Sequence, residues 1–199
     1  MMTVSSKLDD EEKVALAKAG LAAFQADLQT WMVTVPLQHG VVVALHSPVH
    51  NRFVRLINGK VDTRGGCKDK DSLPLGWYGE MFLVVQPPST QFPANKSLVA
   101  LYNVHSKRYI CTQGKGRVGA GEEKELDDPL REEEVFDCVT VEKTLRYCKI
   151  ALRSPVTDSY MSVLDTNGPI DMHAKEILAW EHLEIIPISL APSEGSHLA

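Results

Sequence analysis

Val43-Ala44-Leu45-His46-Ser47, followed by Phe53-Val54-Arg55 and by Asn58-Gly59-Lys60-Val61-Asp62, decides the fold, because the chain repeats this series twice more. In every copy an aromatic residue follows the alanine by nine positions, at 44 and 53, 100 and 109, and 151 and 160. A repeat of about fifty residues is typical of an architecture built from equivalent units. The later copies are Val99-Ala100-Leu101-Tyr102-Asn103, Tyr109-Ile110-Cys111 and Gly116-Arg117-Val118-Gly119, then Ile150-Ala151-Leu152-Arg153-Ser154, Tyr160-Met161-Ser162 and Asn167-Gly168-Pro169-Ile170-Asp171.

Each copy also ends with a strand-like run in which a glutamate stands two residues before a large apolar residue. The short alternating runs, broken by glycine, asparagine and proline, predict four strands in each unit. Asn58-Gly59 and Asn167-Gly168 are strong two-residue hairpin signals. One such unit cannot bury its apolar face, whereas three units can close into one barrel. We therefore expect an all-β protein, a β-trefoil of three four-stranded repeats with twelve strands. The glutamate pairs are Glu80 and Phe82, Glu134 and Phe136, and Glu181 and Leu183.

The repeat pattern over residues 41 to 188 resembles the fascin-like branch of the trefoils, to which hisactophilin is also similar. The third copy carries the resemblance most fully, through Ala151-Leu152-Arg153-Ser154 and Trp180-Glu181. A fascin-like protein would bind filamentous actin, and a hisactophilin-like protein would bind actin and membranes in a pH-sensitive manner. The similarity lies in the repeat skeleton, so it assigns no role to any single surface residue.

The chain divides into an N-terminal extension over 1–36, a single trefoil domain over 37–189 and a flexible tail over 190–199. The repeats are expected over about 41–86, 97–142 and 148–188. Apolar residues recur at steps of three and four in the extension, which predicts an amphipathic helix that packs on the trefoil or docks a partner. This stripe consists of Val14, Ala17, Leu21, Phe24, Leu28 and Trp31.

Composition places the protein among globular intracellular binding proteins. Hydrophobic residues make up 44% of the chain, and the formal net charge is −5, which disfavours a nucleic-acid partner. No apolar run approaches the roughly 20 residues of a membrane span, and the N-terminal region lacks a secretory signal. The four cysteines form no metal-binding or redox spacing, so we expect reduced thiols and a cytoplasmic protein.

The sequence contains no motif of a known catalytic class. It has no nucleophile elbow, P-loop, dinucleotide fingerprint or zinc-protease motif. The glycines at 114, 116 and 119 resemble a phosphate loop, but no helix follows them, so a hairpin turn is the better interpretation. His46, His50 and His105 fall in or after the first strand of their repeats, and we expect scattered surface histidines. We therefore expect a protein without catalytic activity, metal or cofactor.

Charge differs among the three copies although their fold signals match. Repeats 1 and 2 carry ten bases against two acids over 50–70 and 105–117, whereas the corresponding part of repeat 3 carries two bases and three aspartates. If the first two hairpins lie side by side, their bases form a patch that attracts an acidic partner. The alternative is that these bases only balance the acidic loop over 122–134. The candidate partner-binding residues are Arg52, Arg55, Lys60, Arg64, Lys107, Arg108, Lys115 and Arg117.

These observations favour a non-enzymatic binding module, namely an actin- or cytoskeleton-associated fascin-like protein that uses the basic patch. A protein-binding adaptor that docks through its N-terminal helix is an alternative. A trefoil that binds anionic lipid or carbohydrate is another, although the Gln-x-Trp repeats of sugar-binding trefoils are absent. The sequence leaves the oligomeric state open, and fold alone does not decide among these functions.

Overall fold

The computed structural model describes residues 37–63, 78–92, 97–144, 147–164 and 168–188. The expected N-terminal helix, the C-terminal tail and Arg64 lie outside these residues. Within the described part, no helix is long and apolar enough to span a membrane. The strands of repeat 1 are β1 (Val42–Ser47), β2 (Arg52–Phe53), β3 (Arg55–Ile57), β4 (Lys60–Asp62) and β5 (Phe82–Val85). Those of repeat 2 are β6 (Leu98–Asn103), β7 (Arg108–Gln113), β8 (Arg117–Glu123) and β9 (Phe136–Lys143). Those of repeat 3 are β10 (Cys148–Ser154), β11 (Ser159–Val163), β12 (Ile170–Ala174) and β13 (Leu183–Pro187).

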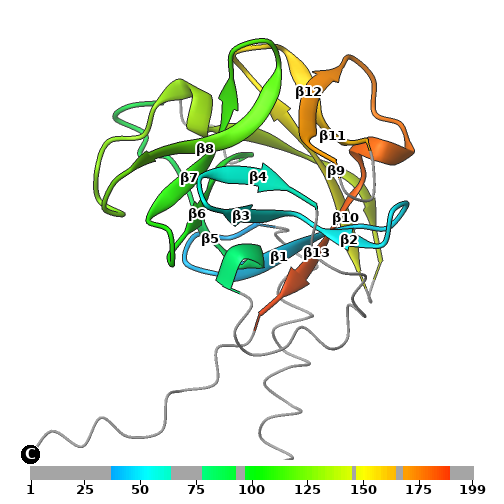
Figure 1. The fold of residues 1–199 in the computed structure, drawn as a ribbon, viewed down its shortest axis with the longest axis horizontal. Coiled ribbons are helices and arrows are strands. Elements are labelled where there is room, and N and C mark those ends of the chain that lie inside the picture. Colours follow the sequence, from blue (N-terminus) through cyan, green and yellow to red (C-terminus); the bar gives the residue numbers. More distant parts are fainter. Residues whose placement is uncertain (1–36, 64–77, 93–96, 145–146, 165–167, 189–199) are drawn as a thin grey trace, which may run out of the picture.

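Six strands close into an antiparallel barrel. β1 pairs with β5 and β13, β6 pairs with β5 and β9, and β10 pairs with β9 and β13, so the ring has no open edge. The remaining strands form hairpins, and Figure 1 shows β4, β8 and β12 on one side of β1 and β13. The pairing of β8 with β12 joins the hairpins of repeats 2 and 3, and the bridge between Asp62 and Pro169 joins those of repeats 1 and 3. The fold is a β-trefoil, as the sequence predicts.

Repeat 1 has five strand segments because Val54 interrupts its second strand. The Val54 amide donates to the Leu45 carbonyl at 2.9 Å, so the break is a local irregularity within one strand rather than an extra element. β2 and β3 together therefore occupy the place of β7 and β11.

The three repeats share one register at the aromatic residue. Phe53 lies opposite His46, Tyr109 opposite Tyr102 and Tyr160 opposite Arg153, which are the corresponding pairs of each repeat. Two positions before each aromatic, the backbone adopts a left-handed conformation, with φ of 49°, 51° and 52°. The nine-residue spacing thus reflects one tight turn built three times, at Asn51, Lys107 and Asp158.

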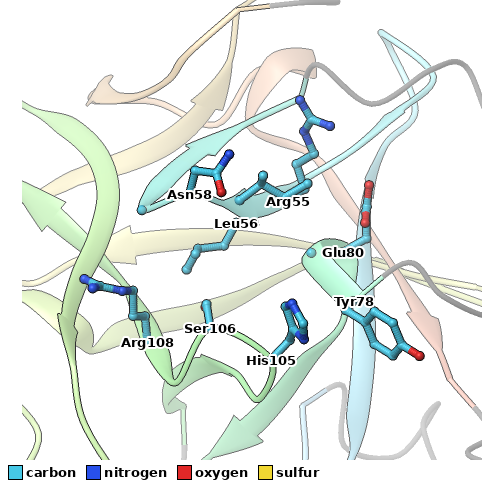
Figure 2. A pocket seen from close by; sticks show the side chains of 11 residues that line it. Arg55, Leu56, Asn58, Tyr78, Glu80, His105, Ser106 and Arg108 are labelled. Atoms are coloured by element: carbon cyan, nitrogen blue, oxygen red, sulfur yellow. The ribbon is translucent and has the colours of Figure 1, made fainter.

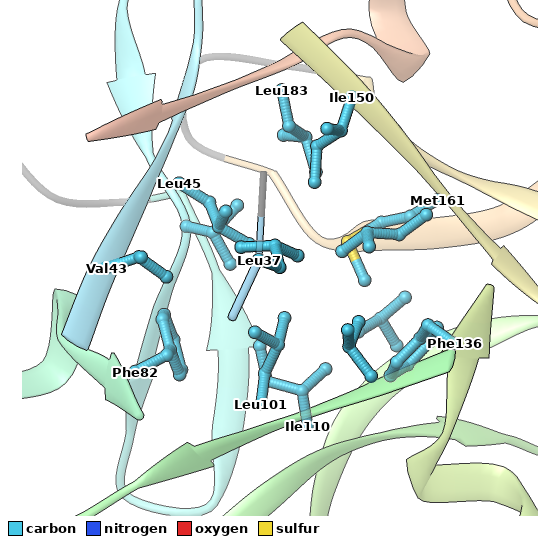
Figure 3. Close-up of a cluster of buried hydrophobic side chains, with 14 of the residues drawn as sticks. Leu37, Val43, Leu45, Phe82, Leu101, Ile110, Phe136, Ile150, Met161 and Leu183 are labelled. Carbon is cyan, nitrogen blue, oxygen red and sulfur yellow. The ribbon is translucent and has the colours of Figure 1, made fainter. Parts of the chain in front are cut away.

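The barrel interior is filled by alternate residues of its strands together with residues of the hairpins. Figure 3 shows side chains from all three repeats meeting in a single cluster. Burying large aliphatic and aromatic side chains in this way contributes about 1.5–3 kcal/mol each, and this is the main source of stability. The cluster includes Leu37, Val43, Leu45, Phe82, Leu101, Ile110, Phe136, Ile150, Met161 and Leu183.

The glutamate that ends each repeat is buried inside a short 3-10 turn. These turns are η2 (Tyr78–Glu80), η3 (Glu132–Glu134) and η4 (Ala179–Glu181). The Glu134 carboxylate accepts a hydrogen bond from the Arg131 amide at 2.9 Å, and the Glu181 carboxylate accepts one from the Leu178 amide at 2.7 Å. In repeats 2 and 3 the glutamate therefore caps its own turn just before the closing barrel strand, which explains its fixed position in these two repeats.

Candidate functional site

A pocket of about 660 Å³ lies between repeats 1 and 2. We call it the inter-repeat pocket. Its walls are the β3–β4 hairpin, the η2 turn and the turn between β6 and β7. Figure 2 shows Leu56 and Asn58 of the hairpin across from Ser106 and Arg108 of repeat 2. The pocket is also lined by Arg55, Tyr78, Glu80 and His105.

Arg55 is held at the rim of the pocket by its own hairpin. It lies opposite Asp62 in the β3–β4 register, and its Nε donates to Asp62 Oδ1 at 2.6 Å. The hairpin turn is the predicted Asn-Gly turn, with φ of 52° at Asn58 and 71° at Gly59. The hairpin thereby places Arg55 and Asn58 along one wall, while the Arg55 guanidinium points away from Ser106 and His105 (Figure 2).

Arg108 occupies the opposite wall, as the first residue of β7. One Nη atom donates to the carbonyl oxygen of Gly121 at 2.7 Å, and the other lies 3.7 Å from a Glu123 carboxylate oxygen. A guanidinium carries five N–H donors in a planar fork, so Arg108 can bind a further carboxylate or phosphate oxygen. The site thus brings together two arginines that are distant in sequence and belong to different repeats.

Asn103 joins two walls of the pocket. Its Nδ2 donates to the carbonyl oxygens of Tyr78 at 2.6 Å and Met81 at 3.0 Å, and its Oδ1 accepts from the Ser106 amide at 2.9 Å. The rings of Tyr78 and His105 stack across the same junction, with centroids 5.2 Å apart. These contacts fix η2 to the β6–β7 turn.

The structure gathers only part of the predicted basic set. Arg55 and Arg108 line the inter-repeat pocket, and Lys60 follows its hairpin turn. Lys115 and Arg117 lie instead at the β7–β8 hairpin, where Arg117 is opposite Asp171 of β12. Arg52 Nη1 donates to the Asn51 carbonyl at 3.1 Å, and Lys107 forms an ion pair with Glu125. Lys60, Lys115 and Arg117 have no ion pair within the described ranges.

The predicted patch is less basic than the sequence count suggests. No acid lies between His105 and Arg117 in the chain, but the β7–β8 hairpin brings Glu123 beside Arg108. The following residues then bring Glu125 to Lys107. The pocket residues that the sequence did not indicate are Asn58, Tyr78, Glu80, His105 and Ser106.

A second pocket, of about 370 Å³, lies between repeats 2 and 3. Its lining is mainly apolar, with Phe92, Leu98, Val135 and Val156, and Arg153 is its one base. Because it contains none of the candidate residues, it is not the site that the charge pattern predicts.

The described residues offer little to covalent or metal chemistry. No group of three histidine, cysteine, aspartate or glutamate side chains in this part of the chain is placed to hold a metal ion. Burial raises the pKa of the Cys111 thiol to about 11 and that of the Cys138 thiol to about 12. Both side chains are therefore protonated at neutral pH, and the nucleophilic form of cysteine is the thiolate.

Comparison with known proteins identifies the fold. A scan of family models finds no match to the chain, and a search of curated proteins finds none. Among solved structures, the chain is similar to a BEL β-trefoil, with 12% identity, a TM-score of 0.55 and coverage of 76% of this chain and 95% of that one.

Two further trefoils are similar to the same extent. The designed threefold-symmetric protein ThreeFoil has 8% identity and a TM-score of 0.54, covering 74% of this chain and 99% of its own. The SDF2-like protein from Arabidopsis thaliana has 9% identity and a TM-score of 0.54, covering 75% and 93%. At such low identity the likeness shows the β-trefoil fold alone.

Proposed function

We propose that the chain is a non-enzymatic binding module that docks an acidic protein on the inter-repeat pocket and the bases beside it. The observation that carries this proposal is that Arg55 and Arg108, from different repeats, both line one pocket. Lys60, which follows the lining residue Gly59 in the hairpin, adds a cation without an ion pair among the described residues. Clustered cations on a protein of net charge −5 steer and orient an acidic partner.

Filamentous actin is the partner to test first. The fascin-like resemblance of the three repeats supports this choice, and actin is an acidic protein that a basic pocket fits. The pocket also offers hydrogen-bond donors to a carboxylate, because the guanidinium of arginine binds carboxylates through a planar fork of N–H groups. A cytoskeletal role inside the cytoplasm follows from this partner and belongs to the same proposal.

The test is co-sedimentation of the full chain with actin filaments over a salt series. Arg55→Gln, Lys60→Gln and Arg108→Gln in one variant should lower the affinity by about tenfold or more, since each lost charge removes a contact to the acidic surface. Wild-type binding should weaken steeply as salt rises, because screening acts over about 8–10 Å at physiological ionic strength.

The matched control removes three bases from repeat 3, with Lys149→Gln, Arg153→Gln and Lys175→Gln. These bases also form local contacts, to Glu142, to Asp158 and to the Thr157 carbonyl. The control should therefore match the site variant in lost charge and in thermal stability, while retaining actin binding. Equal loss of binding in both variants would show that only net charge matters and that the pocket is not the site.

A further inference from the structure

Two carboxylates of the chain form ion pairs with bases next to the inter-repeat pocket. The Lys107 ammonium donates to Glu125 Oε1 at 2.6 Å. An Nη atom of Arg108 lies 3.7 Å from Glu123 Oε2. Lys107 and Arg108 both belong to the predicted partner-binding set, so the end of β8 and the residues just after it bring acidic side chains to these bases.

The pairing of β8 with β7, and its continuation at Lys124, set the positions of these two glutamates. Glu123 ends β8 directly opposite Arg108, and the Lys124 amide donates to the Lys107 carbonyl at 2.9 Å, which continues the ladder by one step. Side chains alternate between the two faces of an extended chain. Glu123 and Glu125 consequently face the bases, whereas Lys124 turns to the buried Glu134.

Both contacts are accessible to a competitor. The side chains of Glu123 and Glu125 are 64% and 71% exposed, and ion pairs in such surroundings are weak. The hydrogen bond from Lys107 to Glu125 raises the pKa of the lysine, so Lys107 keeps its charge in this pair. An incoming carboxylate would replace one exposed ion pair with another, and no buried group would have to move.

We propose that Glu123 and Glu125 occupy the positions that the partner's carboxylates take when it binds. The partner binds through carboxylates at alternate positions of an extended acidic segment. The partner displaces Glu125 from Lys107 and Glu123 from Arg108, so the two glutamates act as an autoinhibitory competitor. This inference rests on the proposed function, because it takes Arg108 of the binding site together with the adjacent Lys107. It adds the spacing and the extended conformation of the acidic groups that the site accepts.

The experiment measures binding of the full chain to an acetylated peptide of alternating glutamate and threonine by calorimetry. The variant carries Glu123→Gln and Glu125→Gln, which keep the side-chain size and remove the charge. Freed from competition, it should bind the alternating peptide about three- to tenfold more tightly than wild type, as expected for the loss of two exposed pairs. For a peptide of the same composition with its glutamates in one block, the gain in affinity of the variant over wild type should be smaller.

Glu132→Gln with Glu133→Gln is the control, because it removes the same charge from the same loop. Neither residue forms an ion pair in the described ranges. If the control gains as much affinity as the first variant, the glutamates act only through net charge and the inference is wrong. Equal gains for the two peptides would overturn the alternate spacing. If the first variant binds the alternating peptide more tightly but no form of the chain sediments with actin, this inference stands and actin is excluded as the partner.

Discussion

Replacement of Glu134 by alanine should lower the free energy of unfolding by about 3 kcal/mol, because it breaks a buried ion pair and leaves its partner uncompensated. Glu134 is 1% exposed. Its carboxylate pairs with Lys124 and accepts the hydrogen bond from the Arg131 amide. We place the loss at the lower end of the usual range because the Lys124 ammonium retains its hydrogen bond to the Pro129 carbonyl oxygen, at 2.8 Å. Urea denaturation measures the change.

The neighbouring Glu133 provides the control for this prediction. It lies in the same 3-10 turn but is exposed. Glu133→Ala should change the free energy of unfolding by less than about 0.5 kcal/mol, as is usual for surface substitutions. If both variants unfolded at the same urea concentration as wild type, the glutamate that ends each repeat would not be the cap that the structure indicates.

Replacement of Asn103 by alanine should cost about 2–3 kcal/mol. The substitution leaves the partly buried Tyr78 and Met81 carbonyls and Ser106 amide without the Asn103 side chain, and the loss of three hydrogen bonds at one residue is costly. Because Asn103 joins two walls of the inter-repeat pocket, the variant should also bind the acidic partner more weakly. Thermal or urea denaturation, followed by co-sedimentation, measures both effects.

Ser154 offers a symmetry-matched control, since it takes the place of Asn103 in repeat 3. It is fully buried, and its Oγ finds no hydrogen-bond partner within the described residues. Ser154→Ala should therefore change stability by less than about 0.5 kcal/mol, because no hydrogen bond is lost. A larger loss at Ser154 than at Asn103 would mean that the Asn103 contacts do not hold the turns together.

The fold could be predicted from the sequence because its determinants are local and occur three times. The spacing from Ala44 to Phe53 encodes a strand, a tight turn and the pairing of the next strand, and the same turn returns at Lys107 and Asp158. The Asn58-Gly59 hairpin is equally local. Repetition turned weak single signals into a specific prediction.

The site could be predicted only in part, because it depends on what the fold places side by side. The arginines were identified by their charge, but the pairing of Arg108 with Glu123 depends on the register of the β7–β8 hairpin. The sequence marks Glu80 as the start of the closing run of repeat 1, but it does not indicate that Tyr78 and Glu80 form a wall beside the turn between β6 and β7. Counting charges along the chain therefore overestimated the free positive charge of repeat 2.

The central claim is that an acidic protein binds at the junction of repeats 1 and 2, and zero-length carbodiimide cross-linking of the chain to actin filaments tests it most directly. This reagent joins a lysine only to a carboxylate that it contacts, so the linked lysines mark the interface. We predict links through Lys60 and Lys107, which are next in the chain to residues that line the inter-repeat pocket, and none through Lys149 or Lys175 of repeat 3. Links confined to Lys149 and Lys175, in a complex that leaves Lys60 and Lys107 unmodified, would contradict the account.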